Sequence, residues 1–264
     1  MKIRSFRALR PNPELVEKVA SVPYDVVNRQ EAAALAEGNP LSMLRIVRAE
    51  IDLPDDVDPY DAKVYDQAAA TLQKFQEDKV LIREKEPSFY VYRQIMDGHS
   101  QSGIIALCRV EDYENDLIKK HEKTRPAKEN DRTTLTDKLS ANPGPVFLTY
   151  RGDSKIDSIV TQAESSAPLY DFTAPDGVQH TVWALPENSG LGAAFEAIPV
   201  TYVADGHHRS ASAARVGKMR REANPNHTGD EDYNWFLCVL FPADQHRPPI
   251  PDRPVEPMSQ QVAY

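Results

Sequence analysis

The stretch Val200-Thr-Tyr-Val-Ala204, Asp205-Gly-His-His-Arg209, Ser210-Ala-Ser-Ala-Ala214 is the most informative part of this sequence. An apolar run typical of a buried strand leads into a glycine turn, and the turn opens a helix of small residues. The start of a helix has free backbone N–H groups and the positive end of the helix dipole, and both suit an anion. The stretch therefore predicts a strand–loop–helix element with an anion site at the loop.

Each residue of this loop has a possible chemical role. Gly206 permits close approach of the backbone to a ligand, and Arg209 offers a two-pronged guanidinium to a phosphate. His207 and His208 can donate hydrogen bonds or move protons near neutral pH, and Asp205 can orient a histidine or hold magnesium. The structural alternative is that Asp205 caps the helix and the histidines are exposed. We favour the functional interpretation, because packing alone does not explain an acid followed by Gly-His-His-Arg.

A second run of mixed charge extends from 119 to 132. Its candidate residues are the catalytic pair His121 and Glu122 and the phosphate-binding cations Lys120, Arg125 and Arg132. Several cations beside a His-Glu pair are enough to bind and polarise a phosphorylated substrate. The alternative is a solvated loop followed by a helix start that Asp131 caps. His121 with His207 or His208 could also form a metal site, but the spacing is not diagnostic, so the metal stays undetermined.

A third segment, Pro23-Tyr24-Asp25, is expected to be extended between two short helices, with Tyr24 or Asp25 lining a substrate pocket. The alternative is a turn with an Asx hydrogen bond. The rigid turn Asn142-Pro-Gly-Pro145 precedes a strand and can shape a pocket without taking part in chemistry.

Composition excludes several classes of partner. Among 264 residues, 31 Lys and Arg stand against 40 Asp and Glu, a net charge of −9, which argues against nucleic acid. Apolar runs are far shorter than the ~20 residues that a bilayer needs, and the first residues lack a secretory pattern. We therefore expect a cytoplasmic protein with no membrane partner, in which Cys108 and Cys238 are buried thiols. The oligomeric state is open.

Hydrophobic periodicity mixes helices and strands without strict βαβ alternation, which predicts an α+β (mixed α/β) fold with a mixed sheet. The predicted helices cover 13–20, 29–37, 61–78, 154–167, 188–198 and 210–223. The predicted strands cover 41–48, 89–95, 104–110, 145–150, 169–172, 179–184, 200–204 and 234–241. We expect one globular domain over 1–244, with two lobes of about 1–150 and 151–244 as an alternative, and a proline-rich disordered tail over 245–264.

Several motifs together resemble the bacterial family known as domain of unknown function 1015. They are Val22-Pro-Tyr-Asp-Val26, Glu37-Gly-Asn-Pro40, Asp58-Pro-Tyr-Asp61, Ile118-Lys-Lys-His-Glu-Lys-Thr-Arg-Pro126, Gly144-Pro-Val-Phe-Leu148 and Ala204-Asp-Gly-His-His-Arg209. The resemblance covers roughly 1–244. Members of the family usually continue well past the strand that ends at Phe241, so the chain looks like a truncated member.

A weaker resemblance is limited to about ten residues. The loop Asp205–Arg209 is similar to the phosphate-binding loop of the ParB and sulfiredoxin superfamily, whose free-serine kinases carry Asp-Gly-His-x-Arg. It implies a small-molecule phosphoryl-transfer or phosphoester enzyme, kinase-like or a phosphatase, with serine or phosphoserine as substrate. Magnesium, held by Asp205 or Glu122, and ATP or ADP are the cofactors expected. The alternatives are a non-catalytic nucleotide-binding regulatory module and an inactive truncated fragment.

Overall fold

The computed structural model describes residues 1–245, and residues 246–264, most of the predicted tail, lie outside the described part. The strands are β1 (Ile3–Arg4), β2 (Leu9–Pro11), β3 (Leu81–Arg83), β4 (Ser88–Met96), β5 (His99–Arg109), β6 (Ile118–Lys119), β7 (Val146–Tyr150), β8 (Tyr170–Thr173), β9 (Gln179–Pro186), β10 (Thr201–Asp205) and β11 (Trp235–Pro242). The helices are α1 (Val16–Val19), α2 (Arg29–Leu35), α3 (Leu44–Val47), α4 (Ala62–Glu77), α5 (Val110–Glu114), α6 (Pro126–Leu139), α7 (Ser154–Glu164), α8 (Leu191–Glu196) and α9 (His207–Ala223).

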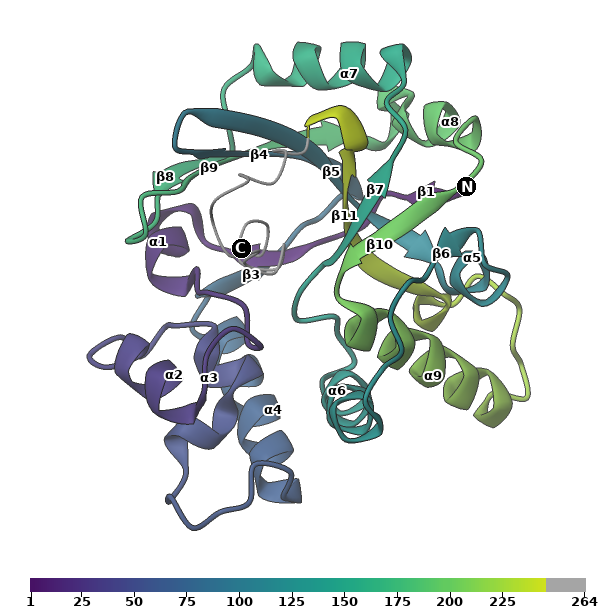
Figure 1. Ribbon diagram of the computed structural model, residues 1–264. Helices are drawn as coiled ribbons and strands as arrows, with labels where there is room; N and C mark the ends of the chain where they lie inside the picture. The colour runs from purple at the N-terminus through teal and green to yellow at the C-terminus, as the bar shows by residue number, and fades with distance from the viewer. Residues whose placement is uncertain (246–264) are drawn as a thin grey trace.

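A mixed sheet organises the molecule (Figure 1). Within residues 1–245 it has nine strands, in the order β6-β10-β7-β11-β5-β4-β9-β8, with β1 beside β5. The central strand β11 runs antiparallel to β5 and parallel to β7. The predicted mixed α/β fold is confirmed. The sheet takes strands from both sides of residue 150, and β2 pairs with β3 in a small separate sheet.

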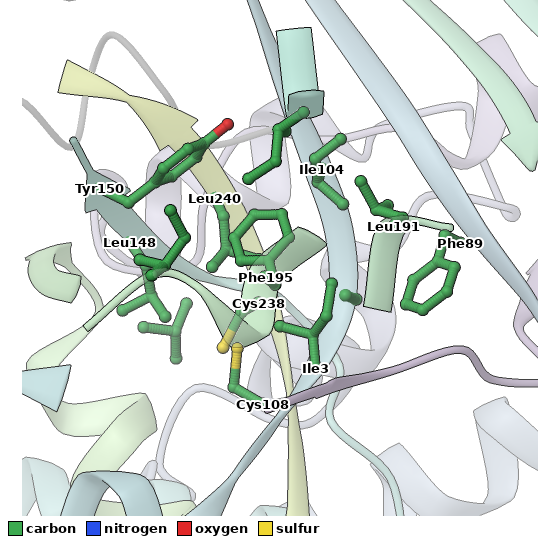
Figure 2. Close-up of a cluster of buried hydrophobic side chains, with 14 of the residues drawn as sticks. Ile3, Phe89, Ile104, Cys108, Leu148, Tyr150, Leu191, Phe195, Cys238 and Leu240 are labelled. Carbon is green, nitrogen blue, oxygen red and sulfur yellow. The ribbon is translucent and has the colours of Figure 1, made fainter. Parts of the chain in front are cut away.

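Alternation along the central strands separates the two faces of the sheet. Phe236, Cys238 and Leu240 of β11 belong to a buried cluster that also contains side chains of α7 and α8 (Figure 2). Val239 and Phe241 belong to a second cluster, with Phe147 and Tyr92, on the other face. Cys108 and Cys238 are fully buried and free, which confirms the expectation of buried thiols.

The helices near the N-terminus pack mainly on one another. Val64, Ala68, Leu72 and Phe75 of α4 are all buried, as their spacing predicts. Figure 1 shows α2, α3 and α4 as a group below the sheet, with α6 beside them. None of the helices in residues 1–245 is long and apolar enough to cross a membrane.

Two predictions for the N-terminal region are wrong. The segment 41–48 forms the short helix α3 rather than a strand, because a short apolar run does not distinguish a buried strand from a buried helical turn. The Ser42 hydroxyl oxygen accepts the N–H of Leu44 and starts that turn. The segment after Pro23 is a turn rather than an extended stretch, since the N–H of Val26 donates to the carbonyl oxygen of Pro23 at 3.4 Å.

Two helix starts also differ from expectation. Helix α6 begins at Pro126 after Arg125, so Asp131 lies inside the helix and does not cap it. Proline suits the first helical position, because its missing N–H has no partner there in any case. Helix α9 begins at His207 rather than at Ser210, and its N-cap is Gly206 rather than Asp205. The histidines of the predicted loop therefore belong to the first turn of a helix.

Candidate functional site

The junction between β10 and α9 depends on Gly206. This residue has φ +91°, a left-handed conformation that favours glycine. A Cβ atom at this position would lie 3.2 Å from Nε of Arg209 and 3.4 Å from Cα of Val146. Gly206 is the N-cap of α9 and has no side chain that could accept the backbone N–H groups of the first turn.

Arg209 ties this junction together. Its guanidinium pairs with the Asp205 carboxylate at 2.6 Å and donates a second hydrogen bond to the carbonyl oxygen of Pro145. Both charged side chains are more than four-fifths buried. The Nε atom of Arg209 is buried and has no hydrogen-bond partner within residues 1–245. The predicted phosphate-binding arginine is thus already engaged on two of its three nitrogens.

His207 and His121 form the centre of a histidine cluster. The His207 ring is buried, and it meets the exposed ring of His121 edge-on at 4.4 Å between centroids. Its Nδ1 atom lies 3.6 Å from the Glu122 carboxylate, and its Nε2 atom has no hydrogen-bond partner among the described residues. Burial lowers the pKa of His207, His121 lowers it further, and the charge of Glu122 opposes the shift. His207 is therefore neutral at pH 7.

His208 connects the cluster to α6. Its Nε2 atom accepts the backbone N–H of Arg125 at 3.0 Å, so the neutral ring carries its proton on Nδ1. Burial lowers the pKa of His208, and the charges of Lys128 and Arg125 act in the same direction, against Glu122 and Asp25. The starts of α6 and α9 therefore lie side by side at the histidine cluster, which we define as His121, Glu122, His207 and His208.

Two of the predicted cations contact partners outside the histidine cluster. Lys120 donates to the carbonyl oxygen of Tyr113 at 3.0 Å and lies over the ring of that tyrosine. Arg132 pairs with Asp131 at 2.7 Å and stacks on the Tyr24 ring at 4.1 Å. Asp131 had no predicted role beyond capping a helix, and the sequence gives no sign of this pairing.

Arg132 and Arg209 instead line a cavity of about 420 Å³, together with Tyr24 and Asp205. The turn 142–145 lines it too, as expected of a turn that shapes a pocket. Burial raises the pKa of Tyr24 to about 12, against the opposing charge of Arg132. Asp25 is exposed and acts on this region through its charge. Further cavity residues, Tyr92 and His180, hydrogen-bond each other at 2.7 Å, and no motif marks them.

The loop therefore contributes to two neighbouring sites. Asp205 and Arg209 line the cavity, whereas His207 and His208 join the histidine cluster. Within residues 1–245, no group of three or more His, Cys, Asp or Glu side chains is arranged to hold a metal ion. The idea of a metal site built from these histidines finds no support there.

Fold and site together define a mixed α/β protein in which a strand–glycine–helix junction adjoins an apolar cavity. A family model described as "Protein of unknown function (DUF1015)" matches residues 3–252, and the chain belongs to this family. No curated protein and no solved structure matches the chain. The likeness of its loop to ParB and sulfiredoxin loops stays a prediction.

The Gly206→Ala variant tests the junction. A left-handed conformation costs a residue with a Cβ about 1–2 kcal/mol, and at this position the new methyl group also presses on Arg209. Gly229 is the matched control, because it has φ +99° and open space around a Cβ. Urea unfolding should show a larger loss of stability for Gly206→Ala than for Gly229→Ala. Equal losses of stability in the two variants would show that the contact with Arg209 does not contribute to stability.

The depressed pKa of His207 predicts how stability depends on pH. A histidine whose folded pKa lies below its unfolded value of 6.5 binds fewer protons in the folded state. The free energy of unfolding should therefore decline as the pH falls through 6.5. His207→Gln should show a smaller decline in urea unfolding between about pH 8 and about pH 5, with the exposed His227→Gln as control. An unchanged decline in His207→Gln would contradict the assignment.

Proposed function

We propose that this chain is a small-molecule phosphoryl-transfer or phosphoester enzyme that uses His207 for proton transfer. The observation that carries the proposal is the environment of His207. The ring is buried and neutral, its Nε2 has no described partner, and the Glu122 carboxylate lies 3.6 Å from Nδ1. A neutral imidazole with a carboxylate nearby is suited to take a proton near pH 7. Catalytic contacts of this kind commonly shorten when substrate binds.

The start of α9 is the phosphate site of this proposal. Its N-cap, Gly206, supplies no side-chain acceptor, and the dipole of a 17-residue helix favours an anion there. Arg125 and Lys128 add positive charge, as their effect on the pKa of His208 indicates. Lys120 and Arg132 are bound elsewhere, so the proposal gives them no role at this phosphate.

In the kinase direction, a substrate hydroxyl oxygen attacks the terminal phosphorus of a nucleoside triphosphate. The new O–P bond forms as the bond to the diphosphate oxygen breaks, and His207 takes the hydroxyl proton. Serine is the first acceptor to test, with phosphoserine as its product. In the phosphatase direction, the oxygen of a water molecule attacks the phosphorus of phosphoserine as the bond from phosphorus to the serine oxygen breaks. His207 takes a proton from the water and gives it to the departing serine oxygen.

Magnesium, where present, would balance the charge of the phosphates. Glu122 is the better donor of the two carboxylates considered, because its side chain is 58% exposed. Asp205 is already paired with Arg209.

A nucleotide-binding module without turnover is the second candidate. One observation favours it: Arg209 is engaged by Asp205 and Pro145, which leaves less of its guanidinium for a phosphoryl group in transfer. Such a module would show ligand-induced thermal stabilisation and release no product. In either case the two buried free thiols support a place in the reducing cytoplasm, and the net charge of −9 supports a small-molecule partner over nucleic acid.

The turnover of His207→Gln tests the enzymatic proposal. Loss of a general base typically costs about 100- to 10,000-fold in rate, so kcat should fall by that factor while KM changes little. The assay uses the full chain with ATP or ADP, with serine or phosphoserine, and with or without magnesium. His227→Gln is the matched control, because this exposed histidine also pairs with a glutamate, Glu231, at 2.9 Å.

Three outcomes separate the candidates. Turnover by the wild-type chain that His207→Gln loses supports the enzyme. Thermal stabilisation by a nucleotide without product supports the binding module. Turnover that His207→Gln retains would show that another group moves the proton.

A further inference from the structure

The proposed chemistry does not use the cavity of about 420 Å³. Helices α1, α3, α4 and α6 line one side, and strands β4, β5, β7, β9 and β11 line the other. Its volume lies within the range of small-molecule sites, about 300–1,000 Å³. Most of the lining side chains are aliphatic or aromatic, for example Val19, Ile46, Leu135, Phe147, Val182 and Val239.

The wall of the cavity carries two guanidiniums. Arg209 is paired with Asp205, and Arg132 is paired with Asp131, which does not line the cavity, so no positive charge is in excess. His180 adds none at neutral pH, because burial lowers its pKa to about 4. Nε of Arg209 is buried without an acceptor among the described residues. An apolar cavity with two guanidiniums at its wall matches an apolar molecule that ends in one anionic group, because such a group accepts hydrogen bonds from guanidinium N–H donors.

We propose that the cavity binds a small organic acid with an aliphatic body, whose anionic group lies at Arg132 and Arg209. The aliphatic walls remove the body from water, and the two guanidiniums supply charge-assisted hydrogen bonds to the acid. A free serine is too small and too polar to fill such walls. That the cavity binds such an acid does not depend on the reaction at His207. That the acid is also the substrate of the enzyme rests on the proposed function.

A series of straight-chain carboxylates from butanoate to decanoate tests the proposal by isothermal titration calorimetry on the full chain. Each buried methylene should tighten binding about fourfold until the cavity is full, after which affinity levels off. Burial of apolar surface should also give a negative heat-capacity change. Decanamide, which lacks the charge, should bind about tenfold more weakly than decanoate. An affinity that does not depend on chain length would overturn the proposal.

Two variants locate the binding. Val182→Phe adds bulk at the cavity wall and should abolish binding of the longer acids, whereas Leu117→Phe introduces the same side chain at an exposed position and should not. Arg132→Gln should weaken decanoate about tenfold or more and leave decanamide unchanged. Wild-type affinity in both Val182→Phe and Arg132→Gln would overturn the proposal, and Arg132→Gln decides alone if Val182→Phe does not fold.

Two further comparisons keep the ligand class and the reaction apart. If AMP binds more tightly than every acid and competes with decanoate, the cavity binds a nucleotide rather than an aliphatic acid. This result would overturn the proposal. The titrations contain neither a phosphoryl donor nor magnesium, so an absence of turnover does not affect them. Turnover with phosphoserine, in turn, does not require that decanoate binds.

Discussion

The guanidinium of Arg209 ties the junction between β10 and α9 to the start of β7, which lies far away in the sequence. It pairs with Asp205 at the end of β10, reaches the carbonyl of Pro145 before β7, and is itself carried by the first turn of α9. The pairing of β10 with β7 shifts register between Val203 and Asp205, so the strand needs such a tie at its end. Gly206 makes the contact possible, because a Cβ atom would enter the space of the arginine.

This contact also explains why the loop serves two sites. Once Arg209 and Asp205 are paired at the cavity wall, the intervening histidines lie in the first helical turn and meet the segment from His121 to Arg125. The histidine cluster, where we propose proton transfer, and the cavity, where we propose ligand binding, are therefore adjacent and have a common support. The helix packing of α6 on α9 fixes the distance between them.

The sequence predicts the fold well where its pattern is long or its turn chemistry is explicit. The helix around Ala68 follows from apolar spacing, and the β4–β5 hairpin follows from Asp97-Gly98, both of which have positive φ. The helix α3 escapes prediction because a four-residue helix with three buried residues is too short to show a helical period. The start of α6 is also missed, because the many charged residues around Pro126 hide this proline as a sign of a helix start.

For the site, the motif identified the residues but not their partners. Nothing in the spacing of Lys120 and Arg132 shows that they turn toward Tyr113 and Asp131, because such pairings are set by tertiary packing. A double-mutant cycle of Asp205→Asn and Arg209→Gln, measured by urea unfolding, tests the central contact most directly. We predict a coupling free energy of at least about 1 kcal/mol, whereas losses that add within about 0.5 kcal/mol would show that the junction does not depend on this pair.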